Sequence, residues 1–195
     1  MLSLALTFFV TTAPPAAPPP TKAATTTTTT TTTTKPTAPT TAAMVAVSDK
    51  DYEAIILAPR AGRVVVVNFW ASYCLPCIEE IPALQELGRE HAADVDVVFV
   101  SSDPPSQAPH ALAILKRRKI EVSSYIVSND EPEPFIQMIN VLRCSGMGDW
   151  GGEMPFTVIY GSDGAVVQKM PGAHKKADFK AAIVAAVAAG QKRQP

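Results

Sequence analysis

Two cysteines three residues apart are the side chains of this sequence best suited to chemistry. Cys74 and Cys77 stand in the segment WASYCLPCIEEIP, which runs from Trp70 to Pro82. This spacing at the start of a helix suits a two-electron dithiol–disulfide cycle, because the second thiol can attack a mixed disulfide formed at the first. Pro76 fits a first helical turn, where its missing N–H would have no partner. The N-terminus of the helix also favours a thiolate at Cys74.

Half of a structural zinc site is the alternative interpretation of two cysteines at this spacing. Such a site needs a second Cys-x-x-Cys or a nearby pair of histidines. The third cysteine, Cys144, is distant in sequence, and His91, His110 and His174 stand singly. The sequence therefore favours redox chemistry and predicts no metal ligands. Cys144 is interpreted as a buried, inert thiol, with an intermolecular or regulatory disulfide as the alternative.

A strand and a helix must position this pair. The strand is predicted over 63–70 (RVVVVNFW), since a near-continuous β-branched run is typical of a central strand buried on both faces. The helix is predicted over 76–91. Strand and helix signals alternate along the chain, which predicts an α/β fold with a central mixed sheet covered by helices on both faces. The other predicted elements are a helix from Ser48 to before Pro59 with Gly62 in the following turn, strands over 94–101 and 124–127, helices over 108–118 and 134–141, a hairpin of 156–160 with 165–169, and a helix over 177–189 that Gly190 ends.

Composition limits the classes of function and the domain organisation. The chain has 195 residues and a formal net charge of −1, so it lacks the basic surface by which proteins bind nucleic acid. It also lacks an apolar run of roughly 18 residues or more, the length of a conventional membrane-spanning helix. Residues 1–43 are interpreted as a signal segment, incomplete in this sequence, followed by a disordered Thr/Pro-rich linker, and residues 44–195 as one domain.

The extreme N-terminus bears on localisation. Leu2 to Val10 is a short apolar run followed by small residues and prolines, as in the latter part of a secretory signal, although it lacks a basic n-region. We expect an exported protein whose Thr/Pro/Ala-rich segment sets the domain off from a membrane or wall. A cytoplasmic protein with a disordered tail, or with its true start at Met44, is the alternative.

The segment from Val64 to Leu84 matches the pattern V-N-F-W-A-x-x-C-x-P-C-x-x-E-x-P closely. In this it resembles the membrane-tethered or periplasmic thioredoxin-like proteins of the TlpA/ResA/DsbE type, and the resemblance extends over about 48–189. Thioredoxins themselves carry an aspartate where this chain has Asn68, whereas the TlpA-like branch has asparagine there and a glutamate after the motif, matching Glu80. The resemblance implies a thioredoxin-like fold. It also implies a cis-proline opposite the dithiol, at Pro155.

The candidate catalytic residues are Cys74, Cys77 and Glu80. Glu80 lies three residues beyond Cys77 on the same helical face, where burial would raise its pKa and fit it for proton exchange with the thiols. A solvated or structural carboxylate is the alternative for Glu80.

Four residues form the predicted substrate-binding set. They are Trp70, Tyr73, Met154 and Pro155. Pro155 in cis would leave the backbone at Met154 free to pair with an extended substrate segment. Trp70 is expected to pack beside the active site more than to touch substrate.

Two functions remain open. The first is a thiol:disulfide oxidoreductase that needs no cofactor beyond the Cys74–Cys77 disulfide. The resemblance implies a reductase of disulfides in exported proteins, kept reduced by a membrane thiol electron donor and serving cytochrome c maturation or similar envelope targets. The second is a Cu(I)-binding envelope protein that uses the same cysteines with the Met154 thioether. The sequence leaves the direction of electron flow open, and a monomer is the expected state.

Overall fold

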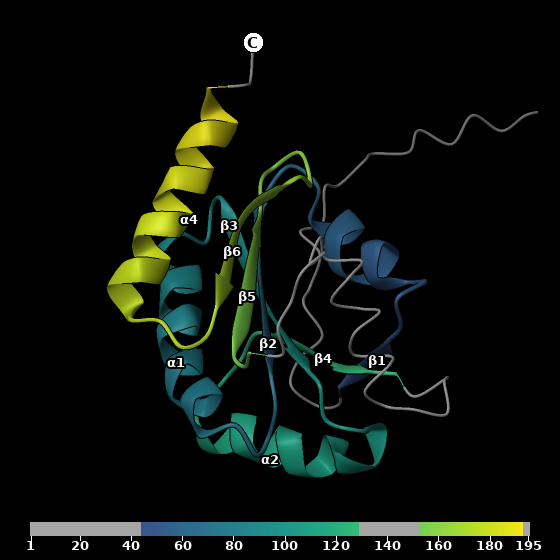
Figure 1. Cartoon of the computed structure of the whole chain (residues 1–195). Coiled ribbons are helices and arrows are strands. Elements are labelled where there is room, and N and C mark those ends of the chain that lie inside the picture. Colours follow the sequence, from purple (N-terminus) through teal and green to yellow (C-terminus); the bar gives the residue numbers. More distant parts are fainter. Residues whose placement is uncertain (1–43, 129–152, 193–195) are drawn as a thin grey trace, which may run out of the picture. The chain divides into compact units, whose positions relative to one another are not determined.

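A six-stranded sheet organises the part of the chain that the computed structural model describes, residues 44–128 and 153–192 (Figure 1). The strand order is β1-β4-β3-β2-β5-β6, and β2 lies near the middle. β1 pairs parallel with β4, and β2, β3 and β4 are also parallel, whereas β5 and β6 are antiparallel to their neighbours. The sheet is therefore mixed, as predicted. The strands are β1 (Val45–Val47), β2 (Val64–Trp70), β3 (Val95–Ser101), β4 (Ser123–Val127), β5 (Phe156–Tyr160) and β6 (Val166–Pro171).

β2 is the strand that carries the cysteine motif, and all seven of its residues are buried. Successive side chains of a strand point to opposite faces of the sheet. Val64, Val66 and Trp70 accordingly belong to one apolar core, and Val65 and Val67 belong to a second core on the other face. This explains why the segment is continuously apolar instead of alternating. Asn68 is the polar residue that interrupts the run, on the same face as Trp70.

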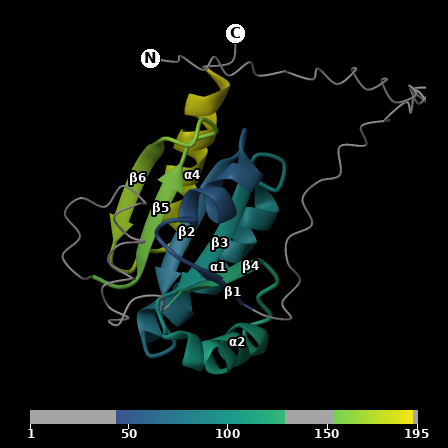
Figure 2. The same cartoon turned by 90° about the vertical axis from the view of Figure 1, so that its right-hand side faces the viewer.

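Helices cover both faces of the sheet. α1 (Leu75–Glu90) and α4 (Lys176–Gln191) lie side by side on one face, as Figure 1 and Figure 2 show. They enclose the first core together with α2 (Ala108–Arg117). The opposite face packs against the short helix η1 (Glu53–Leu57), whose Ile56 is buried in the second core. None of the helices in 44–128 and 153–192 is long and apolar enough to span a bilayer. The two further short helices are η2 (Ala58–Arg60) and η3 (Pro105–Gln107).

The predicted boundaries agree with the structure within about two residues for the strands β2 to β5 and for the helices α1 and α2. The region around Ser48 differs. Instead of capping a helix, Ser48 donates its N–H and its hydroxyl to Asp51 Oδ1, at 2.6 and 2.9 Å. The helix starts only at Glu53, after a turn over 49–51, and the three residues before Ser48 form β1 at the edge of the sheet. The helix ends before Pro59, as predicted, although the separate short helix η2 follows directly and contains Pro59, and Gly62 adopts the positive φ of a turn (85°).

Gly190 does not end the last helix, contrary to the prediction. It is buried within α4, which continues to Gln191. A Cβ at this position would lie 2.8 Å from the hydroxyl oxygen of Ser162, in the turn between β5 and β6. The absence of a side chain therefore permits close packing of the helix against this turn. The helix predicted over 134–141, Cys144 and residues 145–152 of the glycine-rich loop lie outside the described residues.

Candidate active site

The cysteine pair lies where β2 ends and α1 begins. After Trp70 the chain turns, and the Cys74 N–H donates to the carbonyl of Ala71 at 3.0 Å. Cys74 is the N-cap of α1, where its Sγ accepts the N–H of Cys77 at 3.3 Å. Pro76 occupies the first turn of the helix, as predicted. A sulfur at this position faces the unpaired N–H groups of the helix N-terminus, which stabilise a thiolate.

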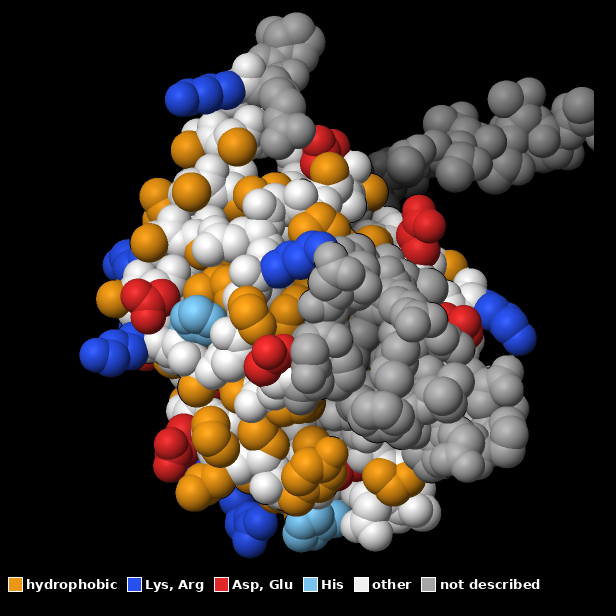
Figure 3. Space-filling model, in the orientation of Figure 1, with side chains coloured by type: hydrophobic (Ala, Val, Ile, Leu, Met, Phe, Trp, Pro, Cys, Tyr) orange, Lys and Arg blue, Asp and Glu red, His pale blue; other side chains and the backbone are white. Residues whose placement is uncertain are grey.

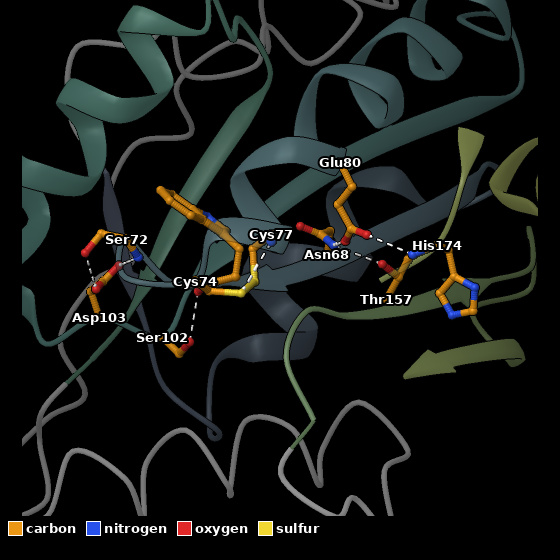
Figure 4. The surroundings of a disulfide bond; sticks show 10 residues. Asn68, Ser72, Cys74, Cys77, Glu80, Ser102, Asp103, Thr157 and His174 are labelled. Carbon is orange, nitrogen blue, oxygen red and sulfur yellow. Dashed lines mark hydrogen bonds between the residues drawn. A yellow bond between two sulfur atoms is a disulfide. The ribbon is translucent and has the colours of Figure 1, made fainter. Parts of the chain in front are cut away.

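Cys74 and Cys77 form a disulfide with an S–S distance of 2.05 Å (Figure 4). Cys77 is fully buried, whereas Cys74 is half-buried. The neighbours of Cys74 on either side are the most exposed large apolar residues described, Tyr73 at 77% and Leu75 at 62%. Only one sulfur of the pair is therefore accessible to another molecule, and apolar surface surrounds it. Cys74 has the exposure of an attacking sulfur, and Cys77 that of a resolving one.

Glu80 is buried in the core behind the disulfide, with 6% of its surface exposed. Its Oε1 accepts the side-chain N–H of Asn68 at 2.8 Å, and its Oε2 accepts the backbone N–H of His174 at 3.3 Å. Asn68 also donates to the hydroxyl oxygen of Thr157, at 2.9 Å. These four residues come from β2, α1, β5 and the turn before α4, and we refer to them as the Glu80 network. Asn68 and Glu80 meet because both face the first core.

Burial raises the pKa of Glu80 from 4.5 to about 7, while the hydrogen bonds from His174 and Asn68 lower it in part. The carboxyl group therefore gains and loses its proton near neutral pH, which is the condition for acid–base work. The expected raised pKa of Glu80 is thus found, and its main cause is the expected one. The adjacent Glu79 is exposed.

The Met154–Pro155 peptide bond is cis, as the resemblance implied. It lies directly before β5, whose first residue, Phe156, pairs with Phe69 of β2. Met154 and Cys74 both pack at the edge of the first core. The cis-proline thus directly precedes β5, the strand that pairs with the one leading to the cysteines.

Trp70 is fully buried in the first core together with Cys77. It packs beside the cysteine pair, as expected, and has no surface to offer a substrate. Its indole Nε1 is one of the buried polar atoms without a hydrogen-bond partner among the described residues, and the Asn68 Oδ1 is another. Of the four predicted substrate-binding residues, Tyr73 is the one with a large exposed surface.

A second hydrogen-bonded group lies beside the disulfide and was not predicted from the sequence. Asp103 follows β3 and accepts the backbone N–H and the hydroxyl of Ser72, at 2.8 and 2.7 Å. Figure 4 shows this pair on one side of the disulfide and the Glu80 network on the other. The order of the predicted strands could have indicated this contact between Asp103 and Ser72. β2 and β3 are consecutive parallel strands, so the residues after them meet at one edge of the sheet.

Three comparisons relate this site to known proteins. A family profile described as Redoxin matches residues 32–186. The chain is 45% identical over 40 residues to the thioredoxin-like protein YneN of Bacillus subtilis, covering 20% of this chain and 24% of that protein. It is 32% identical over 65 residues to the thiol-disulfide oxidoreductase ResA of Halalkalibacterium halodurans, covering 33% of this chain and 37% of that protein. The chain thus spans less than half the length of these two curated relatives.

A solved structure from Chlorobium tepidum, described as a thiol:disulfide interchange protein DsbE, is similar in fold. The TM-score is 0.55 at 25% sequence identity, and the match covers 67% of this chain and 84% of that one. The predicted thioredoxin-like fold is thereby confirmed, as is the resemblance to the ResA and DsbE type.

Proposed function

Because this chain belongs to the Redoxin family, we propose that it is a thiol:disulfide oxidoreductase that reduces disulfides in proteins through Cys74 and Cys77. The observation that carries the proposal is the disulfide between a half-buried Cys74 and a fully buried Cys77 at the N-terminus of α1. An accessible thiolate with a resolving thiol behind it is what thiol–disulfide exchange requires.

The reaction begins from the reduced pair. The Cys74 thiolate attacks one sulfur of a substrate disulfide, forms a mixed disulfide and releases the other substrate sulfur as a thiolate. Cys77 then loses its proton and attacks the Cys74 sulfur, which forms the Cys74–Cys77 disulfide and releases the second substrate thiolate. The substrate has gained two electrons and the domain has lost two. A dithiol donor must return these electrons before the next cycle.

Glu80 is the acid–base group in this proposal. It lies one helical turn beyond Cys77 on α1, and both side chains are buried in the same core. A carboxyl group with a pKa of about 7 can take the Cys77 proton before the resolving attack. The Glu80 network supports this role, because it fixes the carboxylate with two N–H donors and still leaves it able to protonate.

The surface around Cys74 supports a protein substrate. Tyr73 and Leu75 present apolar side chains directly beside the reactive sulfur. Figure 3 shows apolar side chains on the lower part of the face, the end at which α1 begins in Figure 1. The backbone at Met154, before the cis-proline, would pair with an extended substrate segment. Substrates are therefore proposed to be cystine-containing segments with apolar neighbours.

The proposal includes the cellular location of the protein. The names of the ResA and DsbE relatives and the secretory character of Leu2 to Val10 support a periplasmic or envelope location. There the electron donor would be a membrane thiol protein, and the targets would be exported proteins, such as those of cytochrome c maturation. The predicted monomer and the absence of a further cofactor belong to this proposal too.

The reduction potential of the Cys74–Cys77 pair tests the proposed function. We would measure it against glutathione buffers in a Cys144→Ala variant, so that only this pair can react. A reductase predicts a value near the roughly −270 mV of thioredoxin. A value near the roughly −120 mV of DsbA would reverse the direction and make the protein an oxidant. If no two-electron couple appears, the oxidoreductase proposal is wrong, and a Cu(I) titration would test the copper alternative.

A further inference from the structure

Asp103 is a buried carboxylate that the chemistry above does not use. It lies two residues after β3 and is 2% exposed. Besides the two bonds from Ser72, its Oδ2 accepts the hydroxyl of Ser101 at 2.5 Å. Hydrogen bonds to a carboxylate are stronger than those between neutral groups, and a buried carboxylate without them is unfavourable. Asp103 and Ser72 therefore hold each other in place.

The segment that contains Asp103 is hydrogen-bonded to the residues that lead to Cys74. Trp70 of β2 lies opposite Ser101 of β3 in the sheet. Ser102 donates its N–H and its hydroxyl to the Trp70 carbonyl, at 2.8 and 2.9 Å. The tripeptide 101–103 thus binds the end of β2 at Trp70 and again at Ser72. Beyond Ser72 only Tyr73 separates this attachment from Cys74, the N-cap of α1.

We propose that Asp103 is a positioning residue of the dithiol site, which acts through Ser72 to hold the Cys74 sulfur at the N-terminus of α1. The proposal rests on the proposed function of the cysteine pair. The Cys74 thiolate is stabilised only while its sulfur faces the free N–H groups of the first helical turn. Without the attachment at Ser72, the turn can take up other arrangements, and the thiolate loses part of this stabilisation. Asp103 itself does not touch the reacting sulfurs in this proposal.

The experiment measures the reactivity of Cys74 directly. In a Cys77→Ser, Cys144→Ala background Cys74 is the only thiol, and its alkylation by iodoacetamide is followed as a function of pH. Asp103→Asn is expected to raise the pKa of the Cys74 thiol by about one unit, which lowers the alkylation rate below that pKa about tenfold. Ser72→Ala should shift it in the same direction by less, because the backbone N–H of Ser72 still binds Asp103. The double variant should match Asp103→Asn alone, since both changes act on one contact.

Two matched controls separate positioning from general loss of stability. Asp96→Asn removes a carboxylate at the opposite end of β3, where it pairs with Arg63. Ser124→Ala removes a hydroxyl of β4 that donates to the carbonyl of Val122, the residue just before that strand. Both are expected to leave the alkylation profile of Cys74 unchanged, even where they lower the thermal midpoint. If they shift the profile as Asp103→Asn does, the effect is a general one and the proposal is wrong.

Other outcomes of these measurements would also contradict the proposed role of Asp103. An unchanged profile in Ser72→Ala, or additive effects in the double variant, would mean that Asp103 does not act through Ser72. If Asp103→Asn does not fold, Ser72→Ala alone carries the test, because it removes one hydroxyl only. Failure of the proposed function is visible separately, as the lack of a two-electron couple in the protein that retains both Cys74 and Cys77.

Discussion

At the scale of single residues, the two sulfurs of the site differ in what helps them to lose a proton. Cys74 receives help from the helix N-terminus, but Cys77 lies within the core, where ionisation of a thiol is unfavourable. Glu80 is buried in the same core, and its pKa of about 7 matches the task of removing a proton from Cys77. The resolving step is therefore the one that should depend on Glu80.

Replacing Glu80 by glutamine tests this dependence. Glu80→Gln retains the size of the side chain and removes the proton acceptor. We expect the rate of substrate disulfide reduction at pH 7 to fall about a hundredfold, and its dependence on pH near 7 to disappear. The measurement is a pH series of single-turnover reduction of a protein disulfide. Glu79→Gln is the matched control on the exposed side of the helix, and an equal loss of rate in that variant would contradict the assignment.

At the scale of elements, α1 must lie close to the sheet in order to carry both cysteines and Glu80 against it. Gly88, in its last turn, is where this approach is tightest. A Cβ at Gly88 would lie 2.7 Å from Cγ2 of Val97 on β3. Val97 is buried in the core beneath α1, so it has little room to move. The position of α1 thus depends on a glycine far from the chemistry.

Gly88→Ala is therefore expected to destabilise the protein. Overpacking a core costs about 1 to 3 kcal/mol, and the better helix propensity of alanine offsets up to about 1 kcal/mol of it. The difference predicts a net loss of about 1 kcal/mol, and of no more than about 2.5 kcal/mol, in the free energy of unfolding, measured by urea denaturation. In a Val97→Ala background the loss should vanish, because the added methyl group then has space. A gain in stability from Gly88→Ala alone would show that α1 is not held this closely.

At the scale of the whole molecule, the burial of Glu80 links redox function to stability. Between pH 4.5 and about 7 the native protein retains the Glu80 proton while the unfolded chain loses it. The native state then binds more protons than the unfolded state, so the free energy of unfolding decreases as the pH rises through this window. The fold is therefore most stable while Glu80 is neutral, although the proposed acid–base role requires this side chain to ionise near pH 7.

The expected size of this decrease is up to about 3 kcal/mol, lessened by residual solvent screening. Urea denaturation of the oxidised protein between about pH 4.5 and pH 7 measures it, and Glu80→Gln should flatten the dependence. The exposed pair of Glu90 with Lys176 lowers the pKa of Glu90, so its contribution is lost only as the pH falls below 4.5. The two effects therefore occupy different pH windows. A stability that rises between these pH values would contradict the burial of Glu80 as a neutral group.

The amino-acid sequence by itself determined the parts of this protein that depend on local chemistry. The β-branched run before the motif must be a buried strand, and the spacing of Cys74, Pro76 and Cys77 suits only the first turn of a helix. These features were enough to predict the reactive pair within a mixed α/β fold, whereas the thioredoxin-like fold and the cis-proline at Pro155 were implied by the resemblance to the TlpA/ResA/DsbE type. The edge strand β1 was missed because three residues carry too little pattern. The function of Gly190 was misread because its reason lies in a turn distant in sequence.

The tertiary structure decided what surrounds the sulfurs. His174 was seen in the sequence as an isolated histidine, yet its backbone N–H reaches Glu80 across 94 positions of the chain. Thr157 binds Asn68 from 89 positions away, and Asp103 binds Ser72 from 31. No local pattern encodes such contacts, because they exist only once separate strands and helices have packed into one sheet and its cores. The sequence therefore specified the reactive cysteine pair. The packing of distant elements specified the groups around this pair, which are proposed to control its proton transfer and to hold its position.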